Sequence, residues 1–140
     1  MPFVYLDASA LVKAIREEGE DGAVELQAYL EGAELTSSEL VLTEVPRALR
    51  RVAAERPGFE LEAALERSAE AFDAIALRPV DEMLLVGAGL LAEPKLRSLD
   101  AIHVVTALHA YPIDAFVTYD ERQAAVARLA GLAPVAPGVS

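Results

Sequence analysis

An apolar strand runs directly into an aspartate and then into a helix over residues 3–13, FVYLDASALVK. Residues 3–6 show no alternation of polar and apolar side chains, which predicts a strand buried on both faces. Such strands belong to parallel sheets that helices cover on both sides. Asp7 stands at the carboxyl end of this strand, where open α/β sheets bind their ligands. The alternative is that Asp7 only caps the following helix by accepting from its first free N–H groups.

Strands and helices alternate along the rest of the chain. Pro79, near the end of the third expected strand, favours an edge position because proline cannot donate a hydrogen bond to a neighbouring strand. Helices between successive strands imply a parallel sheet, so we expect a single domain over residues 1–140, a three-layer α/β/α sandwich with a central parallel sheet of four to five strands. The expected strands are 3–6, 34–37, 75–80, 115–118 and 133–135, and the expected helices are 9–17, 20–30, 38–55, 60–73, 81–91, 98–110 and 121–130.

The composition limits the kinds of site and partner. Cysteine is absent, which excludes disulfides and thiolate metal sites. We see neither a secretory signal nor an apolar run of the ~18 residues that a membrane span needs, so we expect a cytoplasmic protein with no membrane partner. The net charge of −11 argues against a nucleic-acid partner, since such proteins usually carry a basic footprint. The exception is a protein whose acidic residues converge on divalent cations, because bound metals reverse the local field.

Two further aspartates lie where helices begin. Asp120 repeats the arrangement of Asp7, because the apolar segment 115–118 delivers it at the end of a strand. Its alternative role is to cap a helix, with Gln123 three residues later completing a capping box. Asp100 falls in the first turn of a helix that Ser98 would cap, and an acid there also suits the helix dipole. Each of these aspartates therefore has both a structural and a chemical interpretation.

Glu44 is harder to explain as a surface residue. It follows Val41 by three residues and precedes Ala48 by four, which places it on or beside the apolar face of its helix. A glutamate in that position needs a cation, and Arg47 at i+3 is the structural alternative to a metal. Pro46 in the same helix lacks an N–H and should kink it near residues 42–46, which leaves the aim of Glu44 open.

We expect these four carboxylates to share one crevice. Asp7 and Asp120 follow neighbouring strands, Asp100 starts a helix, and Glu44 faces inward from a helix. Four ionised carboxylates ~5 Å apart repel by about 3 kcal/mol per pair at an effective dielectric of ~20, so the cluster needs cations or a proton. Oxygen-only ligand sets select Mg²⁺ or Mn²⁺. A pair of such ions can bind a phosphodiester, activate water and stabilise the leaving oxygen.

Four motifs resemble those of PIN-domain ribonucleases, most closely the VapC-type toxins of bacterial toxin–antitoxin pairs. They are YLDASALVK, ELVLTEVPRALRR, LRSLDAIHVVTAL and FVTYD, in this order, and the resemblance covers nearly the whole chain. It implies a divalent-metal-dependent endoribonuclease that acts as a toxin and hydrolyses RNA by metal-activated water. It also implies that Asp7, Glu44 and Asp100 are the principal ligands of Mg²⁺ or Mn²⁺, and that Asp120 completes the site, mainly for a second metal.

The same resemblance extends to supporting residues and partners. Ser9 and Thr118 match the small hydroxyl positions often found beside the metal site. Family members typically form homodimers and are blocked by a small VapB-type antitoxin whose tail fills the groove. The hydrophobic fraction of 54% exceeds the usual ~45–50% and leaves apolar surface for such contacts.

Basic residues and histidines offer weaker candidates. Arg47, Arg50 and Arg51 form the one dense basic cluster, and we expect Arg47 and Arg51 to be possible RNA contacts near Glu44. The alternative is a solvated helix face paired to acids. His103 lies one turn after Asp100, but its apolar neighbours favour a hydrogen-bonded structural histidine over a general base.

Two other function classes remain open at this level. One is a phosphatase or phospho-receiver that uses the strand-end Asp7 as its nucleophile. A haloacid-type phosphatase would favour a second aspartate at position 9, where Ser9 stands. A receiver would carry two adjacent acids at the end of the first strand and a lysine after a later strand, and neither is present. The other is a catalytically silent PIN-fold module that serves only to bind a partner, against which the full set of four acids argues.

Overall fold

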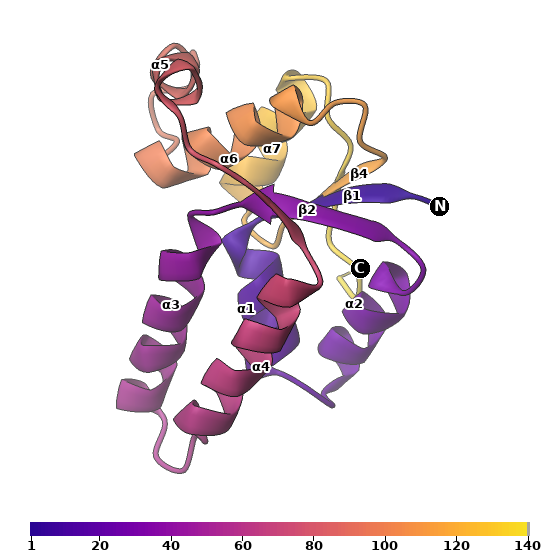
Figure 1. Cartoon of the computed structure of the whole chain (residues 1–140), viewed down its shortest axis with the longest axis vertical. Coiled ribbons are helices and arrows are strands. Elements are labelled where there is room, and N and C mark those ends of the chain that lie inside the picture. Colours follow the sequence, from indigo (N-terminus) through magenta and orange to yellow (C-terminus); the bar gives the residue numbers. More distant parts are fainter. Residues whose placement is uncertain (140) are drawn as a thin grey trace.

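One or two helices separate each pair of successive strands in the computed structural model, which describes residues 1–139 (Figure 1). The strands are β1 (Phe3–Leu6), β2 (Glu34–Ser38), β3 (Ala76–Arg78), β4 (Ala115–Val117) and β5 (Pro134–Val135). The helices are α1 (Ala8–Arg16), α2 (Asp21–Leu30), α3 (Val41–Glu55), α4 (Leu61–Asp73), α5 (Glu82–Gly89), α6 (Ser98–His109) and α7 (Glu121–Leu129).

The five strands form one parallel sheet in the order β3-β2-β1-β4-β5. This confirms the predicted α/β class and the parallel sheet, and it places β3, the strand before Pro79, at an edge as expected. The chain winds outward from β1 in both directions, so the topological switch point lies between β1 and β4. Leu6 pairs with Val117 there. The residues that follow both strands therefore meet at the position where such sheets bind ligands.

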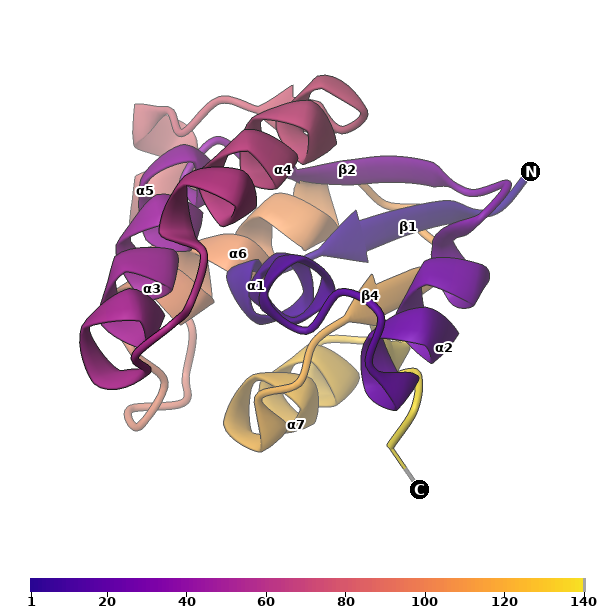
Figure 2. The same cartoon turned by 90° about the horizontal axis from the view of Figure 1, so that it is seen from below.

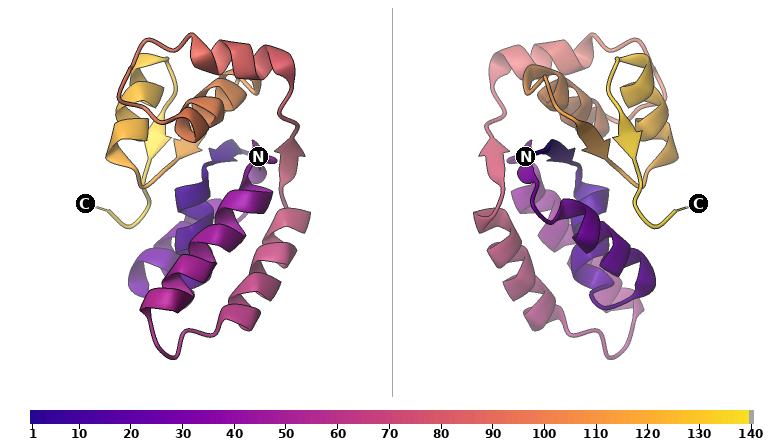
Figure 3. Two further views of the ribbon diagram at one scale, coloured as in Figure 1. Left: turned by 90° about the vertical axis from the view of Figure 1, so that its left-hand side faces the viewer. Right: turned by 90° about the vertical axis from the view of Figure 1, so that its right-hand side faces the viewer.

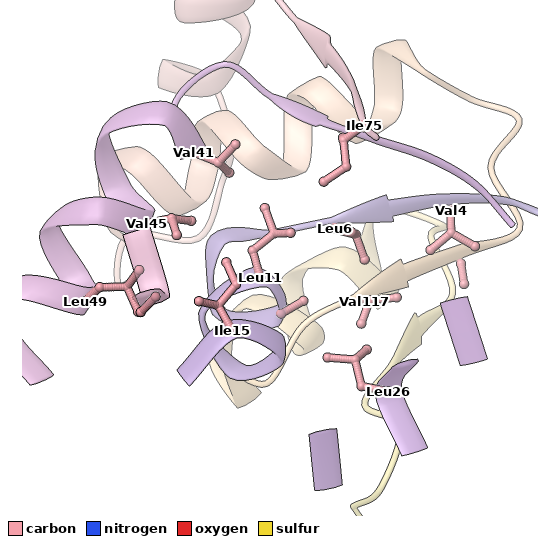
Figure 4. Close-up of a cluster of buried hydrophobic side chains, with 13 residues drawn as sticks. Val4, Leu6, Leu11, Ile15, Leu26, Val41, Val45, Leu49, Ile75 and Val117 are labelled. Atoms are coloured by element: carbon pink, nitrogen blue, oxygen red, sulfur yellow. The ribbon is translucent and has the colours of Figure 1, made fainter. Parts of the chain in front are cut away.

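Two helical layers cover the sheet and bury its opposite faces (Figures 1 and 3). Val4 and Leu6 of β1 pack with the helices α1 to α4, in the cluster drawn in Figure 4. Tyr5 between them packs on the other face with Phe116 and helices α6 and α7. Successive strand residues point to opposite faces, so burial of all three side chains confirms that β1 is covered on both sides.

Helix α1 occupies the centre of its layer, with α3 on one side and α2 on the other (Figure 2). Leu11 and Ile15 of α1 share one core with Val45 and Leu49 of α3 (Figure 4). Both helices start where a central strand ends, α1 after β1 and α3 after β2. They therefore descend side by side from the same edge of the sheet.

On the other side of the sheet, α5 packs against α6 in a smaller core. Gly87 permits this approach, since a Cβ built on it would lie 3.3 Å from Cγ1 of Val105. The other glycine of α5, Gly89, has open space beside it, since an added Cβ would meet nothing within 4 Å.

Several element boundaries differ from the predicted ones. Helix α3 begins at Val41 rather than at residue 38, because Ser38 still belongs to β2 and pairs with Arg78. Helix α3 then continues past Pro46 to Glu55 as one helix. The N-cap of α6 is Arg97 rather than Ser98, and it makes no side-chain capping bond. None of the described helices is long and apolar enough to cross a membrane.

Candidate active site

Asp7 lies at the switch point, 1% exposed, and both of its carboxylate oxygens are engaged. Oδ1 accepts from the Ala10 N–H at 3.0 Å and from Ser9 Oγ at 2.6 Å, whereas Oδ2 accepts from Thr118 Oγ1 at 2.5 Å. Asp7 is thus the N-cap of α1, as its structural interpretation predicts. The two hydroxyl contacts go beyond capping, since a cap needs only the backbone bond.

The hydroxyls of Ser9 and Thr118 donate to Asp7 because each of them accepts a hydrogen bond from the backbone that follows β4. The N–H of Tyr119 donates to Ser9 Oγ at 2.9 Å, and the N–H of Asp120 donates to Thr118 Oγ1 at 3.1 Å. Each hydroxyl therefore accepts from the backbone after β4 and donates to one oxygen of Asp7. This arrangement ties the end of β4 to the end of β1 and surrounds Asp7 with donors.

Burial raises the pKa of the Asp7 carboxyl above its ordinary value, although the hydrogen bonds from Ser9 and Thr118 oppose the shift. No lysine or arginine within residues 1–139 forms an ion pair with Asp7. An ionised Asp7 therefore costs folding free energy unless a proton or an external cation neutralises it.

Glu44 meets a histidine rather than the arginine at i+3. His103 Nε2 lies 2.7 Å from Glu44 Oε1, and His103 Nδ1 lies 2.8 Å from the hydroxyl of Tyr5. A carboxylate only accepts, so Nε2 carries a proton and donates it to Glu44. The preference for a hydrogen-bonded structural His103 is confirmed, since both ring nitrogens have partners. Sequence reasoning missed that one of these partners is a candidate site residue, because the two lie 59 positions apart.

We expect His103→Phe to lower the free energy of unfolding by roughly 1–3 kcal/mol. The phenyl ring keeps much of the volume, but the buried Tyr5 hydroxyl and Glu44 both lose their partner. Urea unfolding followed by circular dichroism measures the change. His109→Phe is the matched control, because His109 is exposed at the end of the same helix. Equal stability of both variants would show that the Tyr5–His103–Glu44 chain contributes nothing.

Asp100 lies in the first turn of α6, as predicted, with its side chain 24% exposed. Burial raises its pKa, and the negative charges of Asp120 and Glu44 act in the same direction. Arg97 and His103 oppose the shift, Arg97 with Nε at 3.9 Å from Oδ2. Asp100 therefore lies near enough to Asp120 and Glu44 for their charges to raise its pKa.

Asp120 caps α7 by accepting from the N–H groups of Arg122 at 2.9 Å and Gln123 at 3.0 Å. The predicted capping box is only half correct, because the Gln123 side chain does not return to Asp120. Its Nε2 instead donates to the backbone oxygen of Asp100 at 3.0 Å, and Gln123 is 1% exposed. Gln123 thereby joins the starts of α6 and α7, the two helices that carry Asp100 and Asp120.

An open cleft of about 770 Å³ lies between α1 and α3 and ends at the start of α6. Glu44, Asp100 and Ser9 line it, whereas Asp7 is buried just behind Ser9 and does not. Asp120 is half-buried and is also absent from the lining. The charged and polar side chains on the cleft are Ser9, Lys13, Arg16, Glu17, Thr43, Glu44, Arg47, Arg51, Arg97, Ser98, Asp100 and Tyr119.

The acidic residues fit a hard divalent cation in chemistry. All four offer carboxylate oxygens, and Asp7 and Asp100 have raised pKa values that a cation would relieve. In the part of the chain that the structure describes, however, no group of three or more His, Asp or Glu side chains is disposed to hold a metal ion. Protein donors occupy Glu44, Asp120 and Asp7 instead, so a metal would have to compete with those donors for the oxygens.

The PIN domain family model matches residues 4–129, a range that contains every residue of this site. The chain belongs to the PIN-domain family. Ribonuclease VapC35 of Mycobacterium tuberculosis is 38% identical over 140 residues, covering 96% of this chain and 97% of that protein. Ribonuclease VapC46 of the same organism is 36% identical and covers 98% and 99%. Ribonuclease VapC47 is 32% identical and covers 96% and 97%. The predicted resemblance to VapC-type PIN ribonucleases is thereby confirmed.

A solved structure shows the same fold at low identity. It is described as VapBC2 from Rickettsia felis bound to a DNA fragment from their promoter, and its matching chain has a TM-score of 0.67 and 13% identity. The alignment covers 95% of this PIN domain and 97% of that chain. Sequence patterns did not indicate the residues that hydrogen-bond to the predicted site residues or to their partners: Tyr5, His103, Tyr119 and Gln123.

Proposed function

We propose that this PIN-domain protein is a divalent-metal-dependent endoribonuclease. The single observation that supports the proposal is Asp7, a buried carboxylate without a protein cation, held by two hydroxyls at the switch point beside a cleft that Glu44 and Asp100 line. Its curated relatives carry the name ribonuclease. We also propose the cytoplasmic location expected from the sequence, where RNA is present. The domain expected over residues 1–140 would carry the activity by itself.

Mg²⁺ or Mn²⁺ would be held by Asp7, Glu44, Asp100 and Asp120, and when bound it supplies an activated water and charge stabilisation for phosphodiester hydrolysis. Ser9 and Thr118 fix the orientation of Asp7 through its two oxygens. His103 holds Glu44 toward the cleft from behind. Gln123 keeps the helix starts that bear Asp100 and Asp120 at a fixed separation. The protein groups thus orient the carboxylates, and none of them serves as a nucleophile.

The geometry disfavours the rival in which Asp7 attacks a phosphoryl group. A nucleophilic carboxylate needs an oxygen that reaches the substrate, but Asp7 is 1% exposed and both of its oxygens accept hydrogen bonds. Incubation with acetyl phosphate followed by intact-mass measurement tests this rival directly, because only a phosphatase or receiver gains a phosphoryl group.

The proposed activity is tested by incubating the purified protein with total RNA in Mn²⁺, in Mg²⁺ and in EDTA, followed by mapping of new RNA ends. We expect discrete cleavage sites with either metal and none in EDTA. Cleavage that persists in EDTA would overturn metal dependence. An absence of cleavage with either metal, in a folded protein, would favour the silent binding module.

We further propose that the enzyme is a toxin that forms a homodimer and is inhibited by a small VapB-type antitoxin. The neighbouring solved structure is a VapBC complex by its description. Exposed apolar side chains on one stripe of the α5 region suit a protein interface, since a monomer rarely leaves them uncovered. They are Met83, Val86 and Leu90, which are 71%, 58% and 79% exposed.

Inhibition is expected to depend on a basic side chain of the antitoxin. An arginine would pair bidentately with carboxylates such as Glu44 and Asp100 at the cleft and compete with the metal for their oxygens. Replacing that arginine with alanine should weaken inhibition more than it weakens complex formation, because apolar contacts elsewhere remain. A cleavage assay and binding calorimetry on the same complexes measure both effects. Inhibition independent of every basic antitoxin residue would refute the mechanism but leave the ribonuclease proposal standing.

A further inference from the structure

The cleft reverses the charge balance of the chain. The whole sequence has 12 basic and 23 acidic residues, whereas the cleft lining has five basic and three acidic ones. The five are Lys13, Arg16, Arg47, Arg51 and Arg97. Basic side chains therefore gather at this cleft out of proportion to their number, although the net charge of the chain is −11.

Helical periodicity places these charges in two rows that lead away from the carboxylates. On α3, Glu44, Arg47 and Arg51 lie on the face toward the cleft, at spacings of three and four residues. On α1, which forms the opposite wall, Ser9 and Arg16 also lie on the face toward the cleft. Arg51 and Arg16 each come seven residues after the site residue of their helix, or ~10 Å along its axis.

Three arginines along the cleft have no acidic partner in the described part of the chain. Arg16, Arg47 and Arg51 form no ion pair within residues 1–139, and Arg16 Nε is buried without a hydrogen-bond partner. Lys13 differs, because its ammonium pairs with Glu17 at 2.7 Å and lies 5.0 Å from the centre of the Tyr119 ring. Arg97 also differs, with Nε 3.9 Å from Asp100 Oδ2. Among the described residues of the cleft, the unpaired cations are thus Arg16, Arg47 and Arg51, and a guanidinium can bind a phosphate through two N–H groups.

We propose that the trough between α1 and α3 is a track for one RNA strand beyond the bond that is cut. In this arrangement Arg47 contacts a backbone phosphate next to the carboxylates. Arg51 and Arg16 grip a second phosphate from opposite walls at the far end. Arg47 and Arg51 are one helical turn apart, ~6 Å along the axis, which is comparable with the spacing of neighbouring phosphates in an extended strand.

The dimensions of the trough favour a single strand over a duplex. Helices α1 and α3 pack directly through Leu11, Ile15, Val45 and Leu49, and packed helices lie only ~8–10 Å apart. The two walls therefore present one line of side chains, whereas recognition of an RNA double helix requires contact across its wide minor groove. A single strand fits as a line of phosphates, which a positive groove binds without regard to base sequence.

This inference rests on the proposed function, but its test measures RNA binding in the absence of cleavage. The probe is a fluorescent 12-nucleotide single-stranded RNA of randomised sequence, with Asp7→Asn as the background that blocks cleavage. Fluorescence anisotropy at several KCl concentrations gives the slope of log affinity against log salt. Each lost phosphate contact should reduce that slope by ~0.7. We expect the reduction for Arg51→Gln, Arg47→Gln and Arg16→Gln, together with a 5- to 20-fold loss of affinity at low salt.

Arg50→Gln is the matched control, because Arg50 is the exposed neighbour of Arg51 on α3 but does not line the cleft. It should leave both affinity and slope unchanged. A duplex of the same length should bind at least 10-fold more weakly than the single strand. Equal effects of Arg50→Gln and Arg51→Gln would overturn the track, as would equal binding of duplex RNA. The ribonuclease proposal would survive either result, since metal-dependent cleavage of total RNA tests it separately.

Discussion

Asp7→Asn should abolish RNA cleavage while leaving the protein folded. We expect the rate to fall by roughly 10²–10³-fold or more, the scale on which loss of one preorganised electrostatic group acts. Asparagine keeps the shape of the side chain and remains a good N-cap for α1, so the fold does not depend on the charge. The measurement is a single-turnover cleavage assay in Mn²⁺, alongside a circular dichroism spectrum and a urea unfolding curve for the same variant.

The stability of the Asp7→Asn variant carries a second expectation, with a definite sign. Burial raises the pKa of Asp7, so the native state binds a proton more tightly than the unfolded chain does. The resulting stability is fully present below the unfolded pKa and is lost as the pH rises through the native pKa. In metal-free buffer at neutral pH, the variant should therefore equal or exceed the wild type in free energy of unfolding, and the difference should shrink as the pH falls toward 4.

Asp81→Asn is the control for capping alone. Asp81 caps α5 by accepting from the Leu84 N–H at 2.8 Å, and it lies outside the cleft. This variant should cleave RNA as the wild type does. A folded Asp7→Asn protein with full activity would eliminate Asp7 from the chemistry and reduce it to a cap like Asp81.

The sequence predicted those features that depend on local pattern. The apolar run before Asp7 identified a doubly covered strand, and the proline at position 79 identified an edge. Capping was one interpretation of the aspartates at helix starts, and Asp7 and Asp120 do cap helices. Hydrogen bonding within one turn, strand alternation and helix capping act over a few residues, so a single sequence contains all of the required information.

What the sequence did not contain were partners chosen by the fold. Glu44 clearly needed a counterpart, and Arg47 was the nearest cation along the helix. The structure places His103 against Glu44 instead. His103 belongs to α6, which packs on the opposite face of the sheet from α3. Gln123 likewise bonds across to Asp100 rather than back to its own cap. Neither choice leaves a trace in periodicity or composition, because both depend on how α6 is placed beside α3 and α7.

The same limit applies to the metal site. Sequence reasoning treated the four carboxylates as a cluster whose repulsion requires cations. Residues 1–139 instead show three of the four acids restrained separately, with no group of three disposed to hold a metal ion. The restraints are hydroxyls on Asp7, His103 on Glu44, and the N-terminus of α7 on Asp120. Metal binding must therefore gain more free energy than these hydrogen bonds contribute, which makes affinity for metal the most direct test of the site.

Mn²⁺ should raise the melting temperature of the wild-type protein. A ligand that binds only the native state stabilises it by about 2.7 kcal/mol at one hundred times its dissociation constant, which is on the order of 8–10 °C for a domain of this size. Asp100→Asn should remove most of this rise, because Asp100 lines the cleft and its charge is coupled to those of Asp120 and Glu44. Asp73→Asn, at the exposed end of α4, should keep it in full.

The pH dependence of the Mn²⁺ effect identifies the groups that bind. Carboxylates must lose their protons before they coordinate a metal, and the pKa values of Asp7 and Asp100 are both raised by burial. The rise in melting temperature should therefore be largest at pH 8. As the pH falls, this rise should weaken at a pH above the ordinary pKa range of carboxyl groups, because the pKa values of Asp7 and Asp100 are raised. A rise that is unchanged by pH, or that survives in Asp100→Asn, would place the Mn²⁺ on other acids of the surface. No rise at millimolar Mn²⁺ would count heavily against a preformed metal site.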